Sequence, residues 1–597
     1  MVLSNMTMKK IFQICSVALI LVGGCKKNLL DTHPNNQVAT SNVWTSDALT
    51  VEGVNGVYAA LRGGASSGTG DMLYELYSMD RYGVTGQDYQ QVELTQGTAT
   101  VNSGLFSTAW QALYEGIARA NDAILNIPAK SPSAATKKGQ YVAECKFLRA
   151  YFYYRLNQVW QGVPIYLTPT DYNKFNHPKS TADQVWAVII NDLTDAINEP
   201  NLPAKYAAGS TDYGRVTKGA AYALRGKVYM YQKNWAAAIA DFQQVKASGY
   251  ALYTGAGANS YSQLFKLANE QCPEMIFSMQ NMDLAGYGSD IEWYCGTRAS
   301  FGSCWSYYSG TPYLADLYEN ADGSKFNWDS VIPGWSSLTP AQREVFFIRD
   351  GATPAELAAA ANRGAQISLY LPVGNQARVM QAYANRDPRM TQTLITPYSS
   401  YQGSGTTYKW QWPFRSAASP NYDIQADNTV GFYYYRKFVE TGPSEISARN
   451  QIPVDFPIIR YADVLLSWAE ALNESSGVTQ AGLDLVNQVR ARAGVALLQN
   501  TNSALSTYVS SQDDFRQRIR NERRVEFPNE GVDYFDELRW GTWLDLKFKP
   551  GNGPMFPWGA AYYTYVNQGN YITTWPVPNS VVQITNGNVQ GTAGWTY

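Results

Sequence analysis

Residues 521–541 read NERRVEFPNEGVDYFDELRWG, and four charged side chains (Glu522, Arg523, Arg524 and Glu526) fall within five positions of a stretch with helical spacing. On a helix, opposite charges three or four residues apart are neighbours and form ion pairs. We therefore interpret this group as an ion-pair network that fixes the C-terminal helices, which is a structural role and not a catalytic one.

Amphipathic helices are predicted on both sides of this stretch from the spacing of apolar residues. The clearest helix pair carries Gly226, Tyr229, Ala238 and Phe242 at the small–aromatic spacing of a tetratricopeptide repeat, and a weaker copy carries Ala469, Leu472, Ala481 and Leu485. Such helix pairs cannot bury their apolar faces alone, so several must stack. The predicted helical ranges are 40–62, 106–127, 141–161, 181–198, 460–493 and 512–527.

The middle of the chain has a different character. Residues 281–450 are rich in Gly, Ser, Tyr, Trp and Pro and show little periodicity, apart from an Ala-rich helix expected at 352–361. Residues 551–597 are similarly loop-like. Long irregular segments inside a folded protein are usually functional or disordered, and the aromatic content argues against disorder.

The N-terminus has the features of an export signal. Lys9 and Lys10 precede an apolar run at 11–22, which is too short to span a bilayer. Residues 22–25 read VGGC and resemble a lipobox, so we expect residues 1–24 to be removed and Cys25 to be lipidated. The alternative is an ordinary secretory signal with a chance cysteine.

The remaining cysteines fit an exported protein. Cys145 lies on a helical stripe and is expected to be a small core residue. Cys295 and Cys304 are close in an aromatic-rich loop and could form a disulfide in an oxidising compartment, although sequence spacing alone cannot show the geometry.

Short motifs along nearly the whole chain resemble, in order, those of the SusD/RagB family of nutrient-binding outer-membrane lipoproteins. The most specific is the 521–541 stretch. The others are LLDTHP (29–34), WQALYEGIARAN (110–121), ECKFLRA (144–150), GVP (162–164), GRVTKGAA (214–221), RDPR (386–389), Arg436-Lys437, IRYAD (459–463), EALN (470–473), NQVRARAG (487–494), PVP (576–578) and Gly594-Trp595.

The resemblance implies one mostly α-helical domain over residues 25–597. Tetratricopeptide-like helices in 40–280 and 451–550 would form the side that packs on a SusC-like TonB-dependent transporter. The irregular segment 281–450 would carry the ligand side, with 25–39 as a lipidated tether and 551–597 as a closing segment. The protein would capture a glycan, or in some members a peptide, and act as the lid of the transporter.

The family implies an outer-membrane location through the lipid anchor, facing the cell exterior. One departure from the family pattern leaves undecided on which face of the outer membrane the protein is displayed. Members shown on the cell surface usually carry acidic residues after the lipidated cysteine, whereas Lys26, Lys27 and Asn28 stand here.

Two groups of residues are candidates for the ligand site, because sugars have apolar faces that stack on aromatic rings and hydroxyl rims that take hydrogen bonds. No motif carries these residues over from the family, and the alternative is that each ring packs locally under a loop. The first group is Asp80, Arg81, Tyr82, Asp88 and Tyr89; the second is Trp293, Tyr294, Trp305, Tyr307 and Tyr308.

Composition narrows the classes of function that the sequence allows. The net charge of −2 excludes a basic surface for nucleic acid, and 17 Trp and 43 Tyr against 21 Phe favour aromatic side chains with a polar tip. No metal or cofactor motif is present, so no cofactor is expected. Tyr318, Asn320 and Asp322 faintly resemble a calcium loop but are expected to form a turn, and a structural calcium elsewhere stays open. The binding protein is preferred over a glycoside hydrolase or a helical scaffold, so we do not expect an enzyme.

Overall fold

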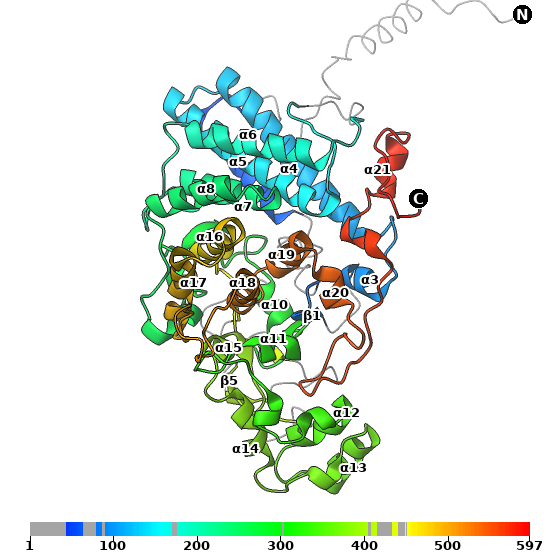
Figure 1. Cartoon of the computed structure of the whole chain (residues 1–597). Coiled ribbons are helices and arrows are strands. Elements are labelled where there is room, and N and C mark those ends of the chain that lie inside the picture. Colours follow the sequence, from blue (N-terminus) through cyan, green and yellow to red (C-terminus); the bar gives the residue numbers. More distant parts are fainter. Residues whose placement is uncertain are drawn as a thin grey trace, which may run out of the picture.

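Antiparallel helices form the N-terminal layer of the structure, a computed structural model that describes residues 43–63, 79–85, 90–169, 176–300, 304–403, 407–414, 433–439, 448 and 451–597. Figure 1 shows this layer at the top of the molecule. Consecutive helices in it pack on one another. They are α2 (Asp47–Ala59), α4 (Gly104–Lys130), α5 (Ala135–Trp160), α6 (Ala182–Asn198), α7 (Lys218–Tyr231) and α8 (Trp235–Ala247), with the shorter α3 (Gln90–Gln96) alongside α4.

The predicted helices are confirmed, and their ends have local causes. Thr181 caps α6 in a capping box with Gln184. Ser46 caps α2, so this helix begins at Asp47 and not at residue 40. Between α7 and α8, a Cβ on Gly226 would lie 2.5 Å from the ring of Phe242, which shows why a small residue stands there.

A second helical layer lies directly below the first (Figure 1). Helix α16 (Tyr461–Ser476) packs on α8 and also on α17 (Gln480–Ala493) and α18 (Gln512–Glu526). The layer continues with α19 (Asp533–Trp540) and α20 (Trp543–Lys547), while α21 (Asn579–Ile584) lies near the C-terminus.

Short elements make up the middle of the chain, as its composition predicted. Helix α13 (Pro354–Asn362) matches the expected Ala-rich helix and belongs to a lobe at the bottom of Figure 1. The other short helices are α9 (Ser260–Gln263), α10 (Ile291–Cys295), α11 (Pro312–Leu317), α12 (Pro340–Arg343), α14 (Asn375–Met380) and α15 (Arg389–Thr393). Single turns of 3-10 helix lie at Ala60–Arg62, Gly257–Asn259, Leu267–Asn269, Trp328–Ser330, Trp335–Ser337, Glu344–Phe347, Ile367–Leu369, Gln381–Tyr383 and Asn570–Thr573.

The described strands are short and antiparallel. One sheet has the order β1-β3-β7-β4, with Thr85 opposite Tyr308 and Gly83 opposite Gly310. Two further pairs join β2 to β8 and β5 to β6. The strands are β1 (Gly83–Thr85), β2 (Met275–Met279), β3 (Tyr308–Gly310), β4 (Leu394–Ile395), β5 (Ser400–Gln402), β6 (Thr407–Lys409), β7 (Tyr433–Tyr435) and β8 (Phe456–Arg460).

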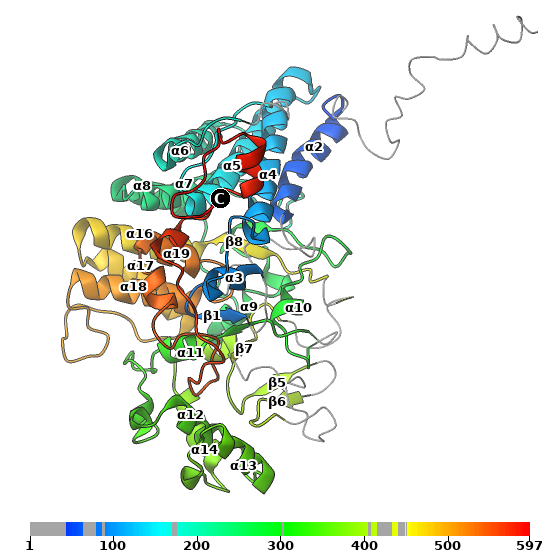
Figure 2. The same ribbon diagram turned by 90° about the vertical axis from the view of Figure 1, so that its right-hand side faces the viewer.

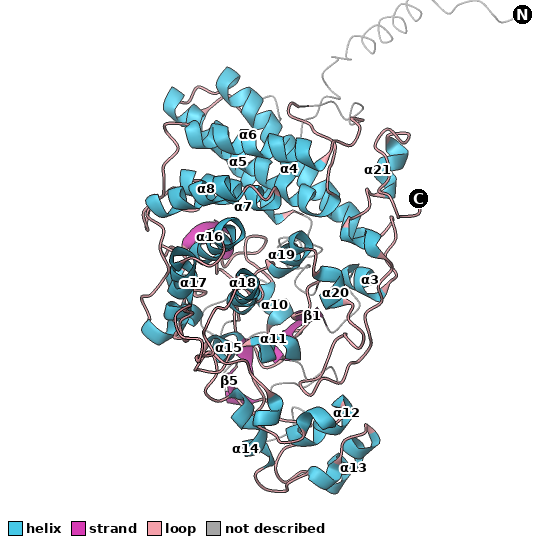
Figure 3. Cartoon of the chain, in the orientation of Figure 1, coloured by secondary structure: helices cyan, strands magenta, loops and turns pink. Residues whose placement is uncertain are grey.

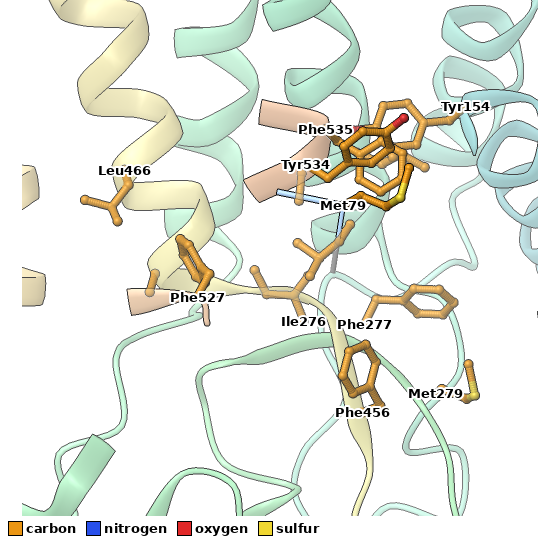
Figure 4. Close-up of a cluster of buried hydrophobic side chains, with 14 of the residues drawn as sticks. Met79, Tyr154, Ile276, Phe277, Met279, Phe456, Leu466, Phe527, Tyr534 and Phe535 are labelled. Atoms are coloured by element: carbon orange, nitrogen blue, oxygen red, sulfur yellow. The ribbon is translucent and has the colours of Figure 1, made fainter. Parts of the chain in front are cut away.

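The predicted mostly α-helical, single-domain fold is confirmed, and helices clearly outnumber strands in Figure 3. Seen from the side in Figure 2, α16, α17 and α18 lie at one edge and α10, β5 and β6 at the other. One apolar core, whose members extend in sequence from Trp44 to Trp595, connects these two edges. Figure 4 shows part of it, where Phe277 of β2 lies near Phe456 of β8.

The charged stretch that opens with Glu522 forms the ion-pair network that the sequence predicted. Glu526 is fully buried and lies 2.9 Å from Arg389 and 2.7 Å from Arg460, and it also pairs with Arg492. Arg523 lies 2.8 Å from Asp463 of α16 and 2.6 Å from Asp536 of α19. The network therefore joins α16, α18, α19 and β8.

Within the described ranges, no helix is both long and apolar enough to cross a bilayer. Cys25 and the expected leader and tether lie outside those ranges. Cys145 is buried in α5, as its place on an apolar stripe predicted.

Candidate functional site

The second predicted group of aromatic residues comes together in one cluster. Helix α10 supplies Trp293 and Tyr294, and the segment that leads into β3 supplies Trp305 and Tyr307. Two backbone hydrogen bonds join these segments: Trp305 N–H donates to Trp293 O (2.8 Å), and Tyr307 N–H donates to Tyr294 O (2.6 Å). The backbone therefore fixes the spacing of the four rings, which we call the aromatic cluster.

Ring geometry gives the aromatic cluster partly parallel faces. The planes of Trp293 and Tyr294 differ by 11° at 6.0 Å, and those of Tyr294 and Tyr307 differ by 25° at 5.8 Å. Trp305 packs edge-on against Trp293 at 4.5 Å. All four side chains are partly exposed, whereas Tyr308 is buried. A partly exposed set of fixed rings can stack on the apolar faces of a ligand at little entropic cost.

Polar side chains from distant segments reach the residues that follow α10. Tyr401 of β5 is hydrogen-bonded to Ser300, which follows α10, at 2.5 Å. The guanidinium of Arg436 lies 5.9 Å from the ring of Tyr401 and donates to Ser400 O at 2.5 Å. These residues were not among the predicted ones, because their approach depends on contacts between segments far apart in the sequence.

The predicted disulfide between Cys295 and Cys304 is wrong. Both residues lie in the described part of the chain as buried thiols, and no disulfide joins them. The sulfur of Cys295 contacts the side-chain amide of Asn529 at 3.3 Å, and Cys304 packs closely against Gly296. Burial raises the pKa of the Cys295 thiol to about 12, so it stays protonated.

The first predicted group is placed differently from the second. Strand β1 pairs with β3, but Asp80, Arg81 and Tyr82 lie beyond the end of β1 that is farther from the aromatic cluster. The Asp80 carboxylate accepts the backbone N–H groups of Tyr82 (2.7 Å) and Gly83 (2.6 Å). Tyr82 is buried, and the Arg81 guanidinium lies 3.6 Å from the ring centre of Tyr313. These contacts give the three residues a role in anchoring β1.

Asp88 and Tyr89 of the first group lie outside the described residues. The structure therefore brings four residues of the second group together in the aromatic cluster, but it does not bring the described residues of the first group to that cluster.

The carboxyl groups on or next to α10 lie in the interior. The two on or next to α10, Asp290 and Glu292, are 1% and 0% exposed. A glycoside hydrolase needs two carboxyl groups that flank the substrate in an open cleft. In the described residues, no group of three or more His, Cys, Asp or Glu side chains could hold a metal ion.

The faint calcium-loop residues form a turn, as predicted. Asp322 accepts a hydrogen bond from the backbone of Ser324 at 2.9 Å, and Asn320 donates to the Ser324 hydroxyl at 2.9 Å. Tyr318 is buried and its backbone oxygen accepts from Arg386.

Comparison with known families assigns this architecture. The family model described as "SusD family" matches residues 273–595, and one described as "Starch-binding associating with outer membrane" matches residues 28–230. The first match covers more than half of the 597 residues, so the chain belongs to the SusD family.

The similarity to known proteins extends over most of the chain. SusD-like protein P38 of Formosa agariphila is 26% identical over 567 residues, which is 92% of this chain and 95% of the relative. A SusD-like carbohydrate binding protein of Bacteroides fragilis has the same fold, with a TM-score of 0.71 at 22% identity, covering 92% of this chain and 100% of that one. Surface glycan-binding protein A of Bacteroides thetaiotaomicron, in complex with laminarihexaose, has a TM-score of 0.58 at 17% identity over the same shares.

Proposed function

We propose that this protein binds an oligosaccharide or polysaccharide on the aromatic cluster of Trp293, Tyr294, Trp305 and Tyr307. The observation that carries the proposal is the set of four partly exposed rings fixed by two backbone hydrogen bonds. Stacking on such rings and hydrogen bonding at their edge match the two kinds of surface on a sugar. The carbohydrate-binding and laminarihexaose-bound relatives support this ligand class.

We further propose that the protein is an outer-membrane lipoprotein, anchored through Cys25, that delivers its ligand to a SusC-like TonB-dependent transporter and acts as its lid. The lipobox-like residues 22–25 and membership of the SusD family support this role. It is a binding role and not an enzymatic one, in keeping with the buried carboxylates beside the cluster. Replacing Cys25 with serine should release the protein from the membrane fraction if the anchor is correct.

Isothermal titration tests the ligand class. The protein that starts after Cys25 is titrated with a panel of polysaccharides, oligosaccharides and peptides, and the mixtures are analysed for products. We expect one glycan class to bind in the micromolar range or tighter with no product. Binding to peptides alone would move the protein to a peptide-importing role, and product formation would make it an enzyme; either outcome overturns the proposal.

A further inference from the structure

A second feature of the molecule points to a different ligand. A cavity of about 50 Å³ lies between α5, α7, α16, α18 and α19, and none of its lining residues belongs to the aromatic cluster. A cavity needs roughly 10–15 Å³ by this measure to hold a water molecule, so there is room for one small ion with a water or two.

Arg155 of α5 lines this cavity and is more than nine-tenths buried. Its Nη1 donates to Gln158 Oε1 at 2.6 Å, and its guanidinium carbon lies 4.0 Å from the ring centre of Phe535. Figure 4 shows the neighbouring Tyr154 beside Phe535 in the core. Nη2 of Arg155 is enclosed and has no hydrogen-bond partner anywhere in the described residues. A buried donor that carries part of a positive charge is costly when it is left without an acceptor.

Both cations and acids line the cavity, and Arg155 differs from the other cations in its partners. The other cations of the cavity form ion pairs. Lys227 and Arg523 both pair with Asp463, and Arg523 and Arg539 both pair with Asp536. Arg539 also pairs with Glu470. Among the described residues, Arg155 is the cation of this cavity for which no ion pair with an acid is formed.

The neighbouring acids pair with other cations. Glu530 also lines the cavity, but it pairs with Lys437 and Arg460. Asp533 and Glu537, on the same helix as Asp536, lie 3.5 Å and 3.4 Å from Arg524 and serve that guanidinium. The network around Glu526 has five cations and six acids. It sets Arg389, Lys437, Arg460, Arg490 and Arg492 against Glu274, Asp387, Glu522, Glu526 and Glu530, with the more exposed Glu319 at its edge.

We propose that this cavity binds one small monovalent anion, such as chloride, on Nη2 of Arg155. The anion would accept the enclosed N–H and pair with the Arg155 guanidinium. The nearby charges of Lys227 and Arg523 would strengthen its binding. Because the cavity joins α5 to α19, an anion there ties the N-terminal helical layer to the 521–541 stretch and stabilises the fold.

Thermal unfolding measures the effect. The full chain after Cys25 is melted in sodium chloride and in sodium gluconate at equal ionic strength. Above the dissociation constant, the Tm should rise by roughly 1 °C for each tenfold increase in chloride beyond the gluconate control. Arg155→Met should remove this difference. Arg119→Met, at an exposed arginine paired with Glu115, should keep it.

Crystals of the unaltered protein grown with sodium bromide give a direct readout that does not depend on the folding of any variant. An anomalous peak within hydrogen-bond distance of Arg155 Nη2 is expected. Water alone in the cavity, or an equal chloride effect in Arg155→Met and the parent protein, would overturn the proposal.

Discussion

Replacing Arg460 with methionine should lower the free energy of unfolding at pH 7 by about 3 kcal/mol, the lower end of the range for breaking a buried ion pair. Arg460 is 1% exposed and lies 2.8 Å from Glu274, 2.7 Å from Glu526 and 2.7 Å from Glu530. Methionine fills part of the volume and offers no donor, so the three carboxylates lose these hydrogen bonds.

The lower end of the range follows from the partners that remain. Each of the three carboxylates keeps at least one other cation: Glu274 keeps Arg492, Glu526 keeps Arg389 and Arg492, and Glu530 keeps Lys437. No carboxylate is therefore left entirely alone, although the network loses one positive charge.

The effect should depend on pH in a defined direction. Burial works against ionisation of Glu526, but the guanidinium groups of Arg492, Arg460 and Arg389 hold its pKa well below the usual range. A depressed pKa in the folded state contributes stability above the ordinary pKa of glutamate, and this stability is lost as the pH falls below it. The gap between parent and variant should therefore narrow from pH 7 to pH 3.

Urea unfolding followed by tryptophan fluorescence measures the gap at both pH values. Arg516→Met on α18 is the matched control, because this arginine pairs with Glu474 and Asp513 and its side chain is 24% exposed. The control should lose less than about 1 kcal/mol. A loss in Arg460→Met no larger than in the control, or a gap independent of pH, would refute the reasoning.

Three further changes test local features. Burial raises the pKa of Asp533 to about 7, so its contribution to stability is lost as the pH rises through 7. Between pH 5 and pH 8, the free energy of unfolding of Asp533→Asn should therefore rise by on the order of 2 kcal/mol relative to that of the parent, as measured by urea unfolding. An unchanged difference would contradict this. Gly226→Ala should cost about 1 kcal/mol, because overpacking against Phe242 exceeds the gain in helix propensity, and a rise in Tm would contradict it. Thr181→Ala should lose about 1 kcal/mol through the cap of α6, while an equal loss in Thr181→Ser would show that the hydroxyl is not responsible.

Periodicity and capping explain why much of the fold could be predicted. The apolar stripe behind Thr181 and the small residue at Gly226 each depend on neighbours within one helix or one helix pair. The charges at Glu522 to Glu526 predicted a network, but not which distant cations complete it. Arg389 and Arg460 reach Glu526 across more than sixty residues of sequence.

The candidate site could be predicted only in part, for a related reason. Trp293 and Trp305 are close enough in sequence for one loop to bring them together. Tyr401 reaches Ser300 across 101 residues, and no local pattern indicates that contact. The prediction of a disulfide was wrong because nearness in sequence does not fix the direction of a side chain. The sulfur of Cys295 instead contacts Asn529.

The most direct test of the central claim is the affinity of Trp305→Ala for the glycan that the parent protein binds, measured by isothermal titration. Trp235→Ala is the matched control, because this half-buried tryptophan lies on α8 in the helical layer. If the aromatic cluster is the binding surface, Trp305→Ala should weaken binding by at least about tenfold, a loss of roughly 1.4 kcal/mol or more. The control should bind as the parent does. Equal affinity in all three proteins, with both variants folded, would contradict the assignment of the site.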